Sequence, residues 1–142
     1  MGAIQEKIVR DFLDAFHAAD VPDFAAMLRH FTEDAAYQPL VPDGSQFVGA
    51  ERIIGVLSNQ FETYTDCVCE ILAIGSGPRH VFTERIDHVT LLRDGRRVHS
   101  RVCAVFELND DDKIVSWREY WDTGNIVTQM GVSRAELDKD IA

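Results

Sequence analysis

The feature that most constrains the fold is a series of four strand-like segments in the second half of the chain. Each alternates apolar and polar side chains and is rich in β-branched or aromatic residues, as half-buried strands are. Turn signals separate them, and Asp94-Gly95 is the dipeptide most typical of a tight hairpin. The sequence therefore predicts a strongly curved antiparallel meander with strands at 67–74, 81–92, 98–108 and 113–122.

Helices are predicted before and after this meander. Apolar side chains recur at helical spacing over 4–19, 24–31 and 49–61, with a short extended segment expected at 35–40. Three helices followed by a curved sheet predict an α+β fold in a single domain, 1–142, in which the sheet encloses an apolar hollow.

Caps and turns are predicted at the ends of these helices. Asp20 is expected to cap the second helix, with Pro22 inside its first turn. A C-terminal helix should start at Thr123 or Asn125, with Asp122 as a candidate cap, and Ser133 is expected to cap another short turn.

Composition excludes several functional classes. The net charge of −10 argues against nucleic acid or an anionic membrane as partner. No apolar run approaches the roughly 18 residues of a membrane span, and the N-terminus lacks the pattern of a signal peptide. Three cysteines do not make an even disulfide framework, which fits a reduced, cytoplasmic protein. Neither cysteine nor histidine spacing completes a zinc set, so we expect no metal and no cofactor.

The strand at 81–92 carries an arginine and an aspartate on one face. Side chains alternate along a strand, so Arg85 and Asp87 point the same way, roughly 7 Å apart along the chain. Their face is otherwise largely apolar, and burying two charges there is costly unless they are paired and hydrogen-bonded. A structural ion pair on the sheet is the alternative reading of these residues.

The last strand offers a second carboxylate. Trp117, Glu119 and Trp121 share one of its faces. Two carboxylates in one dry site tend to hold a single proton between them, and an arginine between them offsets the remaining charge. A neutral carboxylic acid beside a carboxylate base suits the opening of a strained ether ring by water.

These residues resemble the limonene-1,2-epoxide hydrolase family. The resemblance rests on Arg85-x-Asp87, on Trp117-Arg118-Glu119-Tyr120-Trp121-Asp122, and on Phe31-Thr32-Glu33-Asp34-Ala35-Ala36-Tyr37-Gln38. That family belongs to the nuclear-transport-factor-2-like cone fold, which also contains the SnoaL and ketosteroid isomerase proteins. The resemblance implies that this fold extends over nearly the whole chain.

The resemblance also implies roles for individual residues. Asp87 would be the acid that protonates the epoxide, Glu119 the base, Arg85 the bridge between them and Tyr37 a ligand of the attacking water. The pocket walls are expected from Trp117, Trp121, Val89, Leu57 and Phe61. The substrate would be a small hydrophobic molecule, and relatives imply a homodimer formed through the outer sheet face.

Two positions depart from the family pattern. Glu119 stands where the family has an aspartate, and Pro39 where it has an asparagine. Proline has neither an amide side chain nor a backbone N–H, so Pro39 cannot hold the water. A bulge at Pro39 would turn Gln38 inward as a substitute. The alternative function is a non-catalytic or SnoaL-like domain that binds small hydrophobic ligands. A ketosteroid isomerase is disfavoured, because Pro39 occupies its base position.

Overall fold

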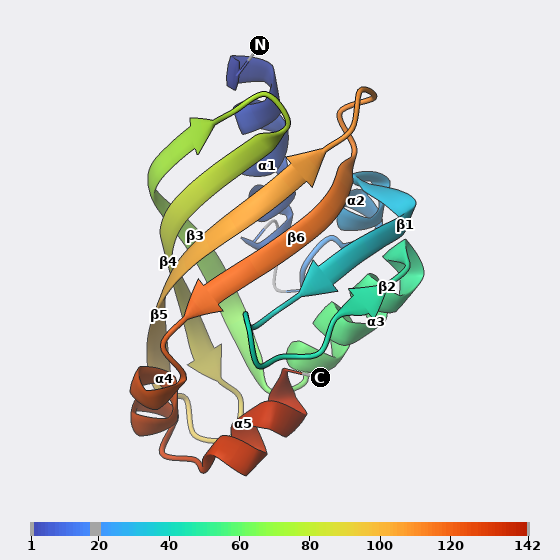
Figure 1. The fold of residues 1–142 in the computed structure, drawn as a ribbon. Coiled ribbons are helices and arrows are strands. Elements are labelled where there is room, and N and C mark those ends of the chain that lie inside the picture. Colours follow the sequence, from blue (N-terminus) through green and yellow to red (C-terminus); the bar gives the residue numbers. More distant parts are fainter. Residues whose placement is uncertain (1, 18–20, 142) are drawn as a thin grey trace.

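One six-stranded sheet, in the order β2-β1-β6-β5-β4-β3, forms the centre of the fold (Figure 1). The computed structural model describes residues 2–17 and 21–141. Neighbouring strands are antiparallel except β1 and β6, which run parallel, so the sheet is mixed and it remains open. The strands are β1 (Phe31–Gln38), β2 (Phe47–Val48), β3 (Tyr64–Ser76), β4 (His80–Leu91), β5 (Arg97–Leu108) and β6 (Ile114–Trp121).

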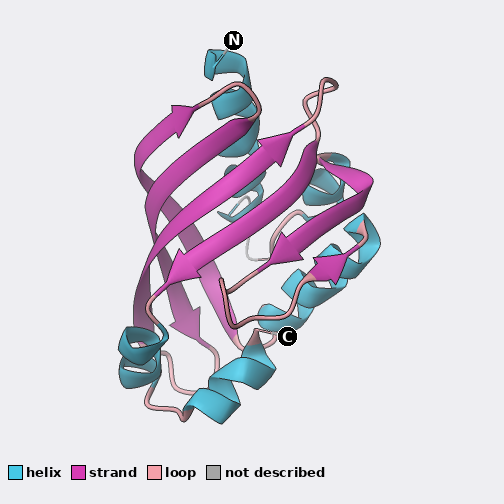
Figure 2. Cartoon of the chain, in the orientation of Figure 1, coloured by secondary structure: helices cyan, strands magenta, loops and turns pink. Residues whose placement is uncertain are grey.

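The helices occupy two places relative to this sheet (Figure 2). The N-terminal group packs against it, with α1 on β3 and β4 and α3 on β1 and β2. The C-terminal pair lies beyond the end of β6 (Figure 1). The helices are α1 (Gly2–Asp14), the 3₁₀ turn η1 (Ala15–His17), α2 (Phe24–Arg29), α3 (Ala50–Gln60), α4 (Thr123–Met130) and α5 (Arg134–Asp140). The predicted α+β architecture, helices on a curved mixed sheet, is confirmed. None of the described helices combines the length and the apolarity needed to cross a bilayer.

The N-terminal helix boundaries differ from the prediction. The first helix ends at Asp14 and continues as a 3₁₀ turn, while the expected cap Asp20 lies outside the described residues. Asp23 is the N-cap of α2, because its carboxylate accepts a hydrogen bond from the backbone N–H of Ala26 at 3.0 Å. Pro22 therefore precedes the cap and is not inside the first turn.

The prediction from the spacing of apolar residues placed the start of one strand wrongly and missed another strand. Phe31, expected at the end of the second helix, is the first residue of β1, which therefore begins four residues earlier than predicted. The short β2 carries no periodic signal, since it has two residues. At the C-terminal end the predictions are confirmed: Asp122 caps α4, and Ser133 caps α5 through a capping box.

The core divides into two clusters along the curved sheet. The larger cluster lies under α1 to α3 and centres on Trp117, whose ring contacts those of Phe12, Tyr37 and Phe106 at centroid distances of 5.1, 4.0 and 5.8 Å. The smaller lies under α4 and α5 and consists of Leu91, Val98, Ile126, Met130 and Leu137. The candidate site lies where the two clusters meet.

Candidate functional site

Arg85 and Asp87 form a bidentate ion pair on the inner face of β4. Nε of Arg85 donates to Oδ1 of Asp87 at 2.8 Å, and Nη2 donates to Oδ2 at 2.9 Å. The arginine side chain is only 2% exposed, whereas that of the aspartate is 21% exposed. The planar guanidinium thus fixes the carboxylate plane of Asp87, while Asp87 keeps access to the interior space.

The same guanidinium reaches Glu119 on β6, across the intervening strand β5. Arg85 lies opposite Val102 of β5, and Glu119 lies opposite Ala104. Two strand spacings amount to about 10 Å, a span that a long side chain such as arginine covers. Ala104 is small and buried, so it leaves room for the guanidinium to pass. Nη2 of Arg85 is hydrogen-bonded to Oε2 of Glu119, so one cation joins both carboxylates.

Glu119 is buried and carries a perturbed pKa. Burial raises the pKa of its carboxyl group and the charge of Asp87 adds to this, while the charge of Arg85 opposes the shift. Hydrogen bonds from Arg85 and from the indole N–H of Trp117, at 3.2 Å, also oppose it. The net direction is upward, so Glu119 is a stronger base than an exposed glutamate.

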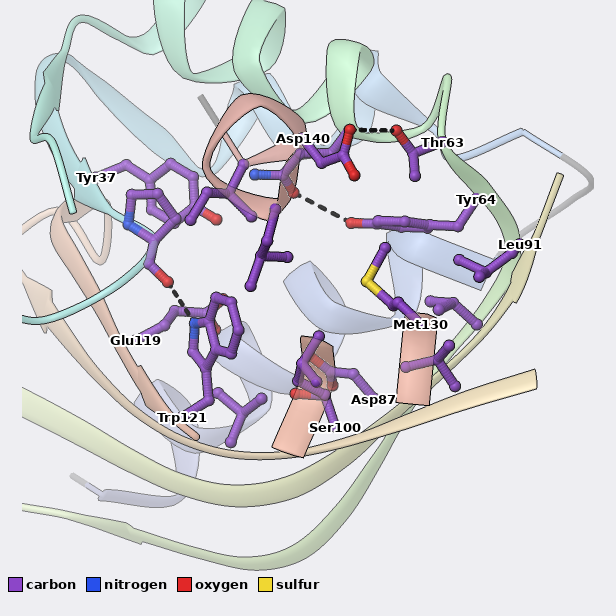
Figure 3. Close-up of a pocket in the computed structure, with 18 residues that line it drawn as sticks. Tyr37, Thr63, Tyr64, Asp87, Leu91, Ser100, Glu119, Trp121, Met130 and Asp140 are labelled. Atoms are coloured by element: carbon purple, nitrogen blue, oxygen red, sulfur yellow. Dashed lines mark hydrogen bonds between the residues drawn. The ribbon is translucent and has the colours of Figure 1, made fainter. Parts of the chain in front are cut away.

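A cavity of about 120 Å³ opens directly beside this constellation (Figure 3). One end is polar and is formed by Tyr37, Gln60, Tyr64, Asp87, Ser100 and Glu119. The remaining wall is mainly apolar and comes from β4, β5, β6, α4 and α5. Its apolar members are Val89, Leu91, Val98, Val102, Trp121, Ile126, Met130, Leu137 and Ile141, and the hydrogen-bonded pair of Thr63 and Asp140 also lines the cavity. An apolar cavity with a few convergent polar groups is the usual form of a small-molecule site.

The structure brings the four expected catalytic residues together. Tyr37, Asp87 and Glu119 line the cavity, and Arg85 lies behind the two carboxylates as their bridge. Of the expected walls, Val89 and Trp121 line it as well.

Three expected wall residues do not line the cavity. Trp117 is 1% exposed, since its indole stacks on Tyr37 and is covered by Phe12. Leu57 is buried in the larger core cluster, and Phe61 packs against that cluster, where its ring contacts those of Phe16 in η1 and Phe24 in α2. Trp117 therefore acts on the site as a hydrogen-bond donor to Glu119 and not as a wall.

The region around Pro39 also departs from expectation. Gln38 does not turn inward: its side-chain amide donates to the carbonyl oxygens of Pro42 and Gly44 at 3.4 and 3.1 Å. The carbonyl oxygen of Pro39 accepts a hydrogen bond from the indole N–H of Trp121 at 2.6 Å. Pro39 therefore lines the cavity and orients Trp121, while Gln38 holds the loop that follows β1.

Sequence reasoning missed Gln60, Tyr64 and Ser100. Gln60 is 6% exposed although it is polar, and it lies four and three residues beyond the buried Val56 and Leu57. The sequence signal for Gln60 is its position as a polar residue on the buried, otherwise apolar side of α3. Ser100 lies opposite Asp87 in the β4–β5 register, so it follows from the hairpin once the register is known. Among the described residues, no group of three His, Cys, Asp or Glu side chains is arranged to hold a metal ion.

Comparison with known protein families shows which family the chain belongs to. The SnoaL-like domain family matches residues 9–117, which contain the second half of α1, all of α2 and α3, and most of the sheet. The chain belongs to this SnoaL-like family, within the nuclear-transport-factor-2-like fold. Trp121 and the residues of α4 and α5 lie beyond the matched segment.

Solved structures share the same fold along most of their length. An LEH-like epoxide hydrolase from M. tuberculosis is 26% identical, with 90% of each chain covered and a TM-score of 0.75. A protein with a ketosteroid isomerase-like fold from Catenulispora acidiphila is 16% identical, with 89% of this chain and 94% of that chain covered and a TM-score of 0.77. The epoxide hydrolase/cyclase-like enzyme SalBIII is 20% identical, with 87% and 94% covered and a TM-score of 0.75.

Proposed function

We propose that this protein is a cofactor-independent epoxide hydrolase. The observation that carries the proposal is the joining of two carboxylates, Asp87 and Glu119, by one buried arginine at the polar end of an apolar cavity. The similarity to the LEH-like epoxide hydrolase supports it. The substrate class is a small lipophilic epoxide, since half of the residues that line the cavity have apolar aliphatic or aromatic side chains.

The chemistry follows from the charges of the constellation. Arg85 carries one positive charge, and in the reactive form the two carboxyl groups share one proton, which makes the site neutral. When that proton lies on Asp87, the more exposed carboxyl group, Asp87 donates it to the epoxide oxygen as the ring carbon–oxygen bond breaks. The oxygen of water forms the new bond to a carbon of the epoxide ring, and one proton of that water passes to Glu119. The product is a vicinal diol, and each proton transfer contributes roughly 10²–10⁴-fold.

After this step the two carboxyl groups have exchanged protonation states. The proton on Glu119 must leave and Asp87 must regain one before the next turnover. The raised pKa of Glu119, caused first by its burial and then by Asp87, increases its strength as the base but limits the pH at which it is ionised. The decrease of kcat at low pH should therefore reflect protonation of Glu119.

The test is hydrolysis of a panel of lipophilic epoxides in ¹⁸O-labelled water. Protein in excess over substrate limits the reaction to one turnover, and the label in the diol is measured by mass spectrometry. Labelled diol in that turnover supports direct attack by water. Unlabelled diol would show that a protein carboxylate attacks first, which contradicts the proposed roles. If no epoxide reacts while apolar probes still bind in the cavity, the protein is a binding domain.

A further inference from the structure

Ser100 is a polar residue on the otherwise apolar inner face of β5. The other inward-facing residues of this strand are all apolar and buried: Val98, Val102, Ala104, Phe106 and Leu108. A hydroxyl group on such a face needs a hydrogen-bond partner. The proposed mechanism has not used Ser100, so its surroundings indicate what that partner is.

The hydroxyl of Ser100 is free to bind a molecule in the cavity. Ser100 is half-buried and lines the cavity (Figure 3). Among the residues that the structure describes, none is hydrogen-bonded to this hydroxyl. By contrast, the hydroxyl of Ser116, on the outer face of β6, accepts a hydrogen bond from Nη1 of Arg118 at 3.0 Å. A hydroxyl without a protein partner keeps its hydrogen for a ligand oxygen.

Ser100 lies directly beside the proposed acid Asp87. The strands β4 and β5 are antiparallel, and Ser100 is the register partner of Asp87. Side chains at opposite positions of an antiparallel pair point to the same face, with their Cβ atoms about 4.5–5.5 Å apart. Both residues line the cavity, and Figure 3 shows them next to each other. The hydroxyl and the carboxyl group therefore border the same part of the cavity.

Orientation of Asp87 is not the task of Ser100. Both carboxyl oxygens of Asp87 already accept hydrogen bonds from Arg85, at 2.8 and 2.9 Å, and this bidentate pair fixes the carboxyl plane. The hydroxyl of Ser100 is thus left for the molecule that Asp87 acts on.

We propose that Ser100 is a catalytic residue that donates a hydrogen bond to the epoxide oxygen, beside the proton donor Asp87. This inference rests on the proposed hydrolase function and adds a residue to it. An ether oxygen has two lone pairs, so it takes the proton of Asp87 on one and the hydrogen bond of Ser100 on the other. Negative charge develops on this oxygen as the ring carbon–oxygen bond breaks. The hydroxyl stabilises that charge and keeps its own proton throughout.

The experiment compares Ser100→Ala with Ser116→Ala, which removes the same atom from the outer face of the sheet. The substrate is the epoxide that the wild type hydrolyses fastest. Ser100→Ala should lower kcat about 10–100-fold with little change in KM, because the hydrogen bond strengthens as charge develops on the oxygen. Ser116→Ala should leave both constants unchanged. Circular dichroism of each variant confirms that the fold is kept.

Two results would overturn the inference. One is a kcat of Ser100→Ala equal to that of the wild type, which would show that the hydroxyl does not act on the reacting oxygen. The other is an increase in KM alone, which would make Ser100 a contact that binds substrate and transition state equally.

A binding measurement separates this inference from the proposed function. If the wild type hydrolyses no epoxide, the proposed function fails, and Ser100 is tested with cyclohexene oxide and cyclohexene, which differ by one oxygen. Binding of each is measured by quenching of tryptophan fluorescence, since Trp121 lines the cavity. The preference for the epoxide over the alkene should be several-fold greater in the wild type than in Ser100→Ala. An equal preference in the two proteins overturns the role of Ser100.

Discussion

Trp117 donates its indole N–H to Oε2 of Glu119 at 3.2 Å, and both side chains project from the inner face of β6. The donor is locked in place by a stack of 4.0 Å between the rings of Trp117 and Tyr37. The tryptophan therefore stabilises the ionised form of Glu119 and lowers its pKa. This relationship couples the aromatic core to the base of the proposed reaction.

Replacing Trp117 by phenylalanine should move the pH dependence of hydrolysis. Loss of the N–H donor raises the pKa of Glu119, so the low pH limb of kcat should shift to higher pH. The measurement is a pH–rate profile of the purified variant. Trp121→Phe is the control, because the N–H of Trp121 bonds to Pro39 and not to Glu119. A limb that moves equally in both variants would contradict this role of Trp117.

Replacing Arg85 by methionine should destabilise the fold in a manner that depends on pH. Glu119 then lies buried without its cation, which costs about 3–5 kcal/mol of unfolding free energy. The charge of Arg85 opposes the upward shift of the Glu119 pKa, so its removal raises that pKa further, and the lost stability returns as the pH falls and Glu119 takes up a proton. Urea unfolding at neutral and acidic pH measures this. Arg101→Met, which removes an exposed pair with Glu84 on the outer face, should change stability little. A loss independent of pH would contradict the electrostatic explanation.

Glu119→Gln should abolish hydrolysis and make the protein more stable than the wild type at high pH. A carboxyl group whose pKa is raised on folding contributes its full stability below its unfolded pKa of about 4.3 and loses it as the pH rises through the folded pKa. Burial raises the pKa of Glu119, and glutamine does not titrate. The difference in unfolding free energy between variant and wild type should therefore grow in favour of the variant with rising pH. A difference that shrinks over this window would contradict the direction of the shift.

The alternation of side chains along two strands was enough to predict from the sequence that the three charged groups lie close together. Arg85 and Asp87 share a face of β4, and Glu119 shares one of β6 with the two tryptophans. Alternation does not distinguish Trp117 from Trp121, since both point inward. One is covered by Phe12 of α1 and the other is left beside the cavity, and this depends on where the helices pack.

The rest of the cavity wall depends on helix rotation and placement. The apolar stripe of α3 is wide, so periodicity alone does not say that Gln60 faces the cavity while Leu57 faces the core. Met130 and Leu137 belong to two short helices after the meander. Their apolar positions predict burial, but no pattern in the chain relates α4 or α5 to the polar end of the cavity.

Asp87→Asn should lower kcat by roughly 10²–10⁴-fold, because asparagine cannot transfer a proton to the epoxide oxygen. The fold should be retained, since the amide keeps the shape of the side chain and one oxygen for Arg85. Diol formation and circular dichroism measure the two effects. Asp66→Asn is the matched control: Asp66 pairs with Arg97 at 3.0 Å on the exposed side of the sheet, so that variant should hydrolyse like the wild type. Full activity of Asp87→Asn would remove Asp87 from the mechanism.

Met130→Ala should shift the preference toward bulkier epoxides. Met130 lies on α4 with 6% exposure and lines the cavity of about 120 Å³. Shortening it lengthens the apolar space without touching the acid or the base. The ratio of kcat/KM for a bulky over a small epoxide should rise about 10-fold or more, the usual scale for one or two methylenes in an apolar pocket.

Val127→Ala provides the comparison for this change. Val127 is on the same helix and packs against the same cluster, but it does not line the cavity. Its variant should lose a little stability and keep the substrate ratio of the wild type. If both variants alter the ratio equally, general loosening of α4 would explain the result, and Met130 would not determine the size of the substrate. If only Met130→Ala alters it, the wall contributed by α4, beyond the matched SnoaL-like segment, sets the specificity of this chain.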